Sequence, residues 1–198
     1  PVNFIVHTMS EVNEKLKLGH YFFTDIVKDG IVLYELKGEK SFAKPKPLNP
    51  NQALEIARDY YDQWMPSVQN FNMLSEAALQ HGMLNERAFL LHQTVERAYT
   101  CAMLVLTYYS PNTHNIKFLR SLADALDERL AEVWPHETKF QRRCFELLKR
   151  AYVEARYSKH YKVSEEELAW IAKQAEALQE LVDTVCKERL ATLSKEAQ

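Results

Sequence analysis

From residue 83 to its end, this 198-residue chain contains no glycine, and only Pro111 and Pro135 interrupt it. Glycine and proline are the residues that most often end helices, so the tract predicts long helices separated at the two prolines. Within it, a stripe of apolar residues three and four positions apart runs from Ala88 to Val105, the period of a helix with one buried face. We expect helices at about 84–108, 116–133, 138–157 and 164–193.

The preceding segment, residues 51–80, has the same apolar spacing, and Pro66 is expected to bend it. A tight turn at Gly82 would follow. Ser164 stands before three glutamates, which is typical of a helix N-cap with an acidic first turn. Because short links place successive helices side by side, the sequence predicts an all-α up-and-down antiparallel helical bundle of about five long helices.

The amino-terminal part of the chain differs in character from this bundle. Residues 2–6 and 31–36 have the composition of strands, residues 21–28 that of a short helix, and Thr8 with Glu11 forms a capping box. An isolated strand pair is marginal in water, so we interpret this part as a small α/β appendage, the tail of something larger. The expected division of the chain is an appendage at 1–40, a proline-rich linker at 41–50 and the bundle at 51–198.

The composition limits the classes of function. A net charge of −2 and a pI near 6.4 provide no global basic field, so nonspecific duplex binding is a poor fit. No apolar run is long enough to span a bilayer, and no basic-then-apolar signal opens the sequence. Cys101, Cys144 and Cys186 are scattered, as in the reduced core of a cytoplasmic protein, and no metal-ligand spacing occurs. We therefore expect no metal and no membrane contact.

Three groups of polar residues are candidates for binding or chemistry. His92 and Glu96 are four residues apart, with Gln93 beside them, and would share one helix face either as a proton-sharing pair or as an internal structural pair. The second group is Thr113 with His114, where the threonine alone would suffice as a helix cap. In the third group, near a helix end, Tyr152 and Arg156 share a face, and Lys159 and His160 follow.

The expected topology places these groups in two sites. In an up-and-down bundle the second and fourth helices run the same way, so His114 and Arg156 would meet at one rim, together with Lys159 and His160. His92 would lie about 24 Å from that rim, at 1.5 Å per residue. A guanidinium fork, imidazoles and tyrosine rings suit a phosphate with a stacked base, although a purely structural rim uses the same residue types.

Four separated motifs stand out in the sequence: Ala88-Phe-Leu-Leu-His-Gln-x-x-Glu96, Pro111-x-Thr-His114, Phe145-Glu-Leu-Leu-Lys-Arg-Ala-Tyr-Val-x-Ala-Arg-Tyr157 and Tyr161-x-Val-Ser-Glu-Glu-Glu-Leu168. Together they resemble the HEPN family, named for higher eukaryotes and prokaryotes nucleotide-binding, over about residues 52–193. The segment 19–34 is similar to the end of the small nucleotidyltransferase domain that often precedes a HEPN domain.

This resemblance implies a helical bundle, a homodimer and a nucleotide or RNA ligand, with no cofactor. It also implies metal-independent RNA cleavage in some members, where an arginine precedes a histidine by four to six intervening residues. Here three residues separate Arg156 from His160. The nucleotidyltransferase Gly-Ser loop and Asp-x-Asp pair are absent from the sequence, so we do not expect nucleotide transfer by these residues.

Three functions follow from these expectations. The first is a dimeric binding module that supports a nucleotidyltransferase domain or partner protein. The second is a metal-independent endoribonuclease of the toxin type found in toxin–antitoxin pairs, with catalytic residues unassigned and Arg156, His114 and His160 as candidates. The third is a structural dimerisation scaffold. The expected ligand contacts are Arg156, Tyr152, His114, Thr113 and Lys159, and the second polar cluster is His92, Gln93 and Glu96.

Overall fold

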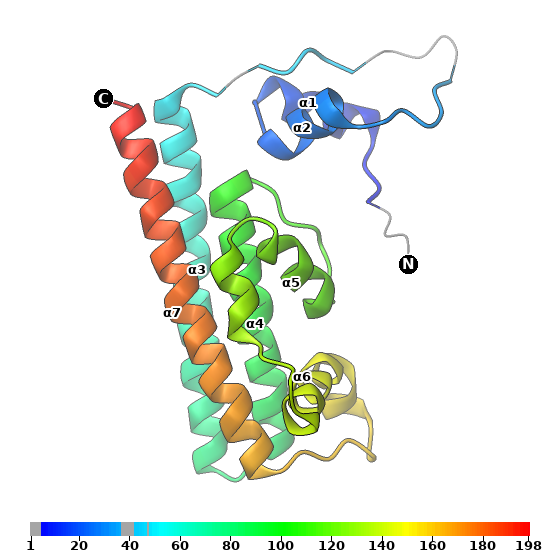
Figure 1. Cartoon of the computed structure of the whole chain (residues 1–198), viewed down its shortest axis with the longest axis vertical. Helices are drawn as coiled ribbons and strands as arrows, with labels where there is room; N and C mark the ends of the chain where they lie inside the picture. The colour runs from blue at the N-terminus through cyan, green and yellow to red at the C-terminus, as the bar shows by residue number, and fades with distance from the viewer. Residues whose placement is uncertain (1–4, 37–41, 47) are drawn as a thin grey trace.

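The computed structural model describes residues 5–36, 42–46 and 48–198, and every regular element in these ranges is a helix (Figure 1). The all-α prediction is therefore confirmed. The elements are α1 (Met9–Lys17), α2 (Tyr21–Asp29), α3 (Pro50–Gln80), α4 (Leu84–Thr107), α5 (Ile116–Asp124), the 3-10 helix η1 (Glu128–Val133), α6 (Lys139–Tyr157) and α7 (Glu165–Glu196).

Helices α3, α4 and α7 form the body of the molecule and lie along its long axis (Figure 1). α3 and α4 are an antiparallel hairpin whose turn uses Gly82 at φ +69°, a conformation that L side chains rarely adopt. α4 is the central helix, and side chains such as Leu91, Val95 and Ala102 are fully buried. This core arises from the apolar stripe that the sequence predicts.

Helix ends follow the capping signals. Thr8 and Ser164 each accept a hydrogen bond from the backbone of a glutamate three residues on, Glu11 and Glu167, and each glutamate bonds back to the cap. α3 continues through Pro66. Because these signals are local, the sequence predicted the bounds of the four long helices to within about three residues.

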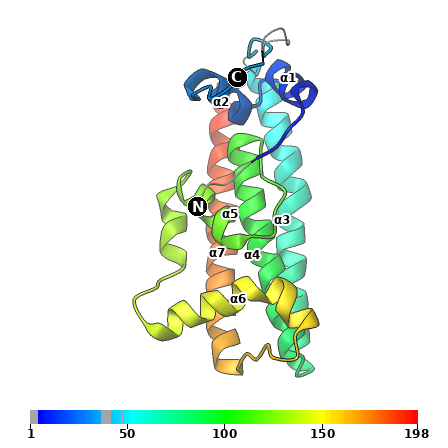
Figure 2. The same ribbon diagram turned by 90° about the vertical axis from the view of Figure 1, so that its right-hand side faces the viewer.

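The direction of α6 differs from the expectation. Instead of running along the bundle as an alternate rod, α6 crosses the body of the molecule (Figure 2) and packs mainly on α4. Its buried residues Leu147, Leu148 and Ala151 lie on the helical face that packs against the body of the molecule. The expectation that the second and fourth bundle helices run the same way was therefore wrong.

The helix expected at 116–133 is also divided. α5 ends at Asp124, and Asp127 then accepts a hydrogen bond from the backbone of Arg129 to start η1. Arg120 of α5 holds the two pieces together, because its Nη2 donates to the carbonyl oxygens of Ala131 at 3.1 Å and Trp134 at 3.3 Å. A side-chain cap, rather than a glycine or proline, makes the break.

The amino-terminal appendage consists of helices in the described residues, not of helices and strands. Residues 5–7 and 31–36 form no strand, and the rest of the expected strand at 2–6 lies outside the described residues. The helical pair docks on the end of α4. His20 Nδ1 donates to the carbonyl oxygen of Tyr108 at 3.2 Å, and the Phe22 ring stacks on Tyr109 with centroids 3.8 Å apart.

Two expectations from the composition concern burial and membranes. Cys101, Cys144 and Cys186 are buried thiols without disulfide bonds, as expected of core residues. In the part of the chain that the structure describes, no helix combines the length and the apolar character needed to cross a bilayer.

Candidate functional site

The chain reverses direction immediately after α4. Tyr108 adopts φ 60° and ends the helix in the left-handed region, so the following loop runs back beside α4 (Figure 1). The reversal places His114 against Glu96, eighteen positions earlier in the sequence. His114 Nδ1 lies 3.0 Å and 3.1 Å from the two Glu96 carboxylate oxygens. His114, which the sequence predicts at the rim, therefore contacts Glu96, which shares a helix face with His92 and was expected far from that rim.

The two sites expected from the sequence form one cluster. Tyr152 of α6 stacks on His114, with ring centroids 3.9 Å apart and an angle of 18° between the planes. The same tyrosine ring lies 5.4 Å from the His92 ring. The expected separation of about 24 Å was wrong because the loop turns back along α4 and α6 crosses at the same level. We call Phe89, His92, Glu96, His114, Tyr152 and Arg156 the His114 cluster.

The His114–Glu96 pair has the geometry of an oriented imidazole. Contact with the carboxylate favours the tautomer with the proton on Nδ1, which leaves Nε2 as an acceptor. Glu96 is 14 % exposed and also accepts a hydrogen bond from Gln93 Nε2 at 3.3 Å, whereas the His114 side chain is 51 % exposed. The pair is therefore fixed on its buried side and accessible on the other, which suits proton transfer or hydrogen bonding to a ligand.

His92 lies at the buried base of the cluster. Its side chain is fully buried, its Nδ1 is 3.7 Å from Glu96 Oε2, and neither ring nitrogen makes a hydrogen bond to a described residue within 3.5 Å. The pKa of His92 is lowered to about 4, chiefly by burial; the backbone of His114 opposes the shift, and the charges of His114 and Arg156 add to it. His92 is therefore neutral near pH 7 and supplies no positive charge.

Arg156 occupies an aromatic surface at the end of α6. Its guanidinium carbon lies 4.6 Å from the Tyr152 ring centroid and 4.8 Å from those of Phe89 and Tyr157. Nε donates to the Tyr152 carbonyl oxygen at 2.7 Å, which orients the fork. Among the described residues Arg156 forms no ion pair with a carboxylate. A fixed, exposed guanidinium without a counter-ion is suited to binding an anion such as phosphate.

Two of the expected ligand residues, Lys159 and Thr113, and the catalytic candidate His160 do not join the cluster. Lys159 and His160 lie exposed in the turn after α6, and neither side chain contacts the cluster in the described part of the chain. Thr113 is not the helix cap, because Asn115 takes that role by accepting from the Phe118 backbone at 3.2 Å. Thr113 instead accepts from the Asn115 backbone and lines two cavities beside the loop.

Sequence reasoning missed two aromatic members of the site. Phe89 belongs to the first of the four motifs and no role was expected of it, although it contacts both Tyr152 and Arg156. Tyr157, 76 % exposed, also lies against Arg156. The spacing of Phe89, three residues before His92, is the signal that identifies it.

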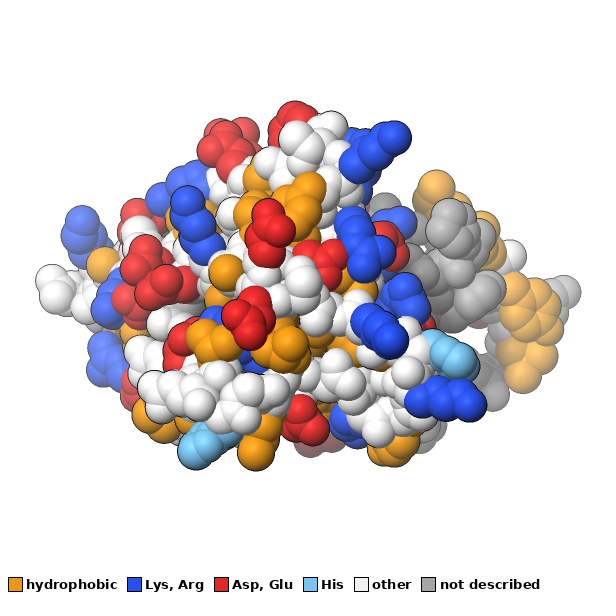
Figure 3. Space-filling view, turned by 90° about the horizontal axis from the view of Figure 1, so that it is seen from below, with side chains coloured by type: hydrophobic (Ala, Val, Ile, Leu, Met, Phe, Trp, Pro, Cys, Tyr) orange, Lys and Arg blue, Asp and Glu red, His pale blue; other side chains and the backbone are white. Residues whose placement is uncertain are grey.

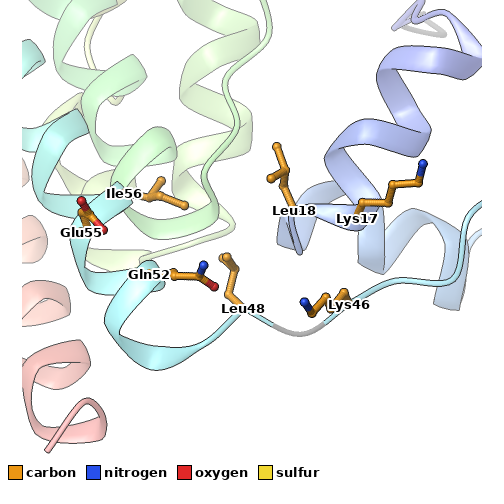
Figure 4. A pocket seen from close by; sticks show the side chains of 7 residues that line it. All are labelled: Lys17, Leu18, Lys46, Leu48, Gln52, Glu55 and Ile56. Atoms are coloured by element: carbon orange, nitrogen blue, oxygen red, sulfur yellow. The ribbon is translucent and has the colours of Figure 1, made fainter.

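Several cavities surround the ends of the helices. One of about 360 Å³ lies between α3, α4 and the loop after α4, and Glu96 is part of its wall. Another of about 300 Å³ separates α1 from the start of α3 (Figure 4). This second cavity is lined by Lys17, Leu18, Lys46, Leu48, Gln52, Glu55 and Ile56, none of which belongs to the His114 cluster.

Charge on the surface is mixed. The end of the molecule seen in Figure 3 carries basic and acidic side chains interspersed with apolar ones, and neither sign covers it. Any phosphate contact at this end therefore depends on individual side chains rather than on a broad basic field. Within the described residues, no group of three or more His, Cys, Asp or Glu side chains is placed to hold a metal ion.

Comparison with known proteins identifies the bundle. The profile of the HEPN domain matches residues 61–187, a range that includes every member of the His114 cluster. No curated protein matches the chain. The match confirms the resemblance stated from the four motifs.

Proposed function

Because the chain belongs to the HEPN family, we propose that it is a nucleotide- or RNA-binding module whose ligand is held by Arg156, Tyr152 and His114. HEPN domains have nucleotide- or RNA-related functions in general, and this supports the class of ligand. The observation that carries the residue assignment is that Arg156 and His114 both contact the Tyr152 ring, at 4.6 Å and 3.9 Å from its centroid.

The chemistry of these groups supports the proposal. The Arg156 fork is oriented by its bond to the Tyr152 carbonyl and has no carboxylate partner among the described residues, so a phosphate would supply the missing negative charge. His114 Nε2 offers an acceptor for a ribose hydroxyl. The surrounding rings of Phe89 and Tyr157 hold the guanidinium in place by cation–π contact.

Replacement of Arg156 by alanine is expected to weaken binding of ATP, GTP or a short single-stranded RNA by roughly 10-fold or more, since a hydrogen bond to a charged group contributes about 1.5–3 kcal/mol. Titration calorimetry measures the change. Arg150→Ala is the matched control, because Arg150 lies on the same helix but pairs with Glu154. Equal affinities of the wild type and Arg156→Ala would remove this site.

A second function, metal-independent RNA cleavage, is favoured by the His114–Glu96 pair. In this reaction His114 Nε2 takes the proton of the ribose 2′-hydroxyl, and the 2′-oxygen attacks phosphorus. The bond from phosphorus to the 5′-oxygen breaks, and this oxygen leaves with a proton supplied by water. Arg156 would stabilise the charge that develops on the phosphorane. The products would be a 2′,3′-cyclic phosphate and a 5′-hydroxyl. His114 fits the role of base better than His160, which does not contact the cluster in the described residues.

We also propose that residues 1–40 are the C-terminal remnant of a nucleotidyltransferase-like domain, joined by a linker at 41–50 to the HEPN bundle at 51–198. The resemblance of segment 19–34 supports this. So does the exposure of an apolar run, in which Ile31 is 87 % and Leu33 is 93 % exposed. A run of this kind usually packs against another domain or partner protein.

The HEPN bundle is further proposed to form a homodimer, as HEPN domains commonly do. The aromatic residues of α3 contribute contacts within the chain: Tyr61 bonds to Asp183, and Arg97 lies over Trp64 and Phe71. Sedimentation equilibrium over a range of protein concentrations is expected to give twice the chain mass of 23.1 kDa. A single species of one chain mass at all concentrations would contradict the dimer.

A further inference from the structure

The cavity between α3, α4 and the loop after α4 shares one residue with the His114 cluster. Glu96 forms part of the cavity wall, and its carboxylate oxygens also contact His114. The volume of about 360 Å³ lies at the lower end of the range of small-molecule sites. The lining residues used below are Tyr60, Trp64, Glu96, Thr100, Ser110 and Thr113.

One wall of this cavity is aromatic. Tyr60 and Trp64 are four residues apart on α3, so their rings are neighbours on one face of the helix, and both are partly buried. The Arg97 guanidinium carbon lies 5.6 Å from the Trp64 ring centroid and supports that ring. Flat aromatic faces with fixed positions are the surfaces on which nucleobases stack.

One residue of the cavity wall, Ser110, has an unsatisfied hydroxyl. Ser110 Oγ is buried and has no hydrogen-bond partner among the described residues. A buried hydroxyl without a partner costs about 1–3 kcal/mol, so a ligand group that bonds to it gains that amount in return. The Thr100 hydroxyl donates to the Glu96 carbonyl oxygen at 2.9 Å and therefore presents its oxygen as an acceptor. The cavity thus combines stacking surface, one unused hydroxyl and several acceptors.

We propose that this cavity is the base subsite of the nucleotide or RNA site, and that it selects bases with an exocyclic amino group. The inference rests on the proposed function and deepens it. The base stacks on Trp64 and Tyr60, and its amino group donates to the carboxylate of Glu96. Ser110 bonds to a ring nitrogen. An ionised carboxylate accepts hydrogen bonds but cannot donate one, so a uracil carbonyl at the same position would be repelled.

The position of the cavity also orders the rest of the ligand. A base bound to one side of Glu96 has its ribose directed toward His114, which contacts the same carboxylate. Beyond His114 lie Tyr152 and then Arg156. Base, ribose and phosphate would therefore lie in the order Trp64, His114, Arg156.

Nucleosides test the subsite without the phosphate contacts. We expect adenosine and cytidine to bind the wild-type protein at least about 10-fold more tightly than uridine, and Trp64→Leu to weaken adenosine binding about 10-fold, as loss of a base stack does elsewhere. Ser110→Ala is expected to weaken it about fivefold. Titration calorimetry or saturation-transfer NMR gives the affinities. Ser121→Ala, an exposed serine on α5, is the matched control, and Trp64→Phe should restore most of the affinity.

The failure of this inference can be told apart from failure of the proposed function. If ATP binding depends on Arg156 while adenosine binds the wild type and Trp64→Leu equally, with both folded by circular dichroism, the base subsite is wrong and the phosphate site stands. Equal affinities for adenosine and uridine would overturn the proposed selectivity. If ATP, GTP, adenosine and the short single-stranded RNA all fail to bind the wild type, both the subsite and the proposed function are wrong.

Discussion

Lowering the pH from about 7 to about 4.5 is expected to reduce the free energy of unfolding by about 2 kcal/mol through His92 alone. Burial holds the pKa of folded His92 at about 4, below the ordinary value of 6.5. The unfolded chain therefore takes up the proton first as the pH falls. Stability from this group is complete above about pH 6.5 and is lost as the pH falls from there toward 4.

Unfolding by urea at several pH values measures this effect in the wild type and in His92→Gln. The wild type is expected to lose stability more steeply than the variant, because glutamine does not titrate. Burial also lowers the pKa of His20 in the amino-terminal appendage. The variant His20→Gln therefore measures how much of the pH dependence of stability comes from the appendage. Carboxylates with a lowered pKa, such as Glu167, also reduce stability when they are protonated, but they do so at lower pH and equally in all variants. Parallel stability curves for the wild type and His92→Gln would contradict the assignment.

The neutrality of His92 also bears on the division of roles in the cluster. A histidine that stays neutral to about pH 4 cannot donate a proton as an imidazolium near pH 7. His114 is half exposed and is oriented by Glu96, so it is the histidine of the cluster that is placed for proton transfer. His92 then has the role of a packed polar neighbour of the carboxylate.

Local signals in the sequence predicted the helices well. Ser164 and Glu167, which cap each other, mark the start of α7, and Gly82 marks the turn between α3 and α4. These signals act within a few residues, so one sequence is enough to read them. The break at Asp127 was missed because its cap is one aspartate side chain in a run otherwise suited to a helix.

The arrangement of the site was not predictable in the same way. It depends on the crossing of α6 over α4, which is set by packing of Leu147, Leu148 and Ala151 rather than by any local pattern. It also depends on the left-handed conformation of Tyr108, which an aromatic residue rarely adopts. The sequence singles out His92, Glu96 and His114 as polar residues, but only the fold brings the three together.

If the chain cleaves RNA, His114→Ala is expected to lower the rate by about 100-fold to 10,000-fold, the contribution of a positioned general base. Glu96 would act through His114 by holding its tautomer, so Glu96→Gln should lower the rate less and shift its pH profile. The assay is cleavage of single-stranded RNA in EDTA, with the 2′,3′-cyclic phosphate product identified by mass spectrometry.

His160→Ala is the matched control for this prediction, because the sequence offers His160 as the alternative histidine and the structure leaves it exposed in the turn after α6. Full activity in His160→Ala together with loss in His114→Ala assigns the base to the loop after α4. The reverse result would return the assignment to the Arg156–His160 segment. Cleavage unchanged in both variants would exclude a histidine base at either position, whereas no cleavage by the wild type would leave binding as the function.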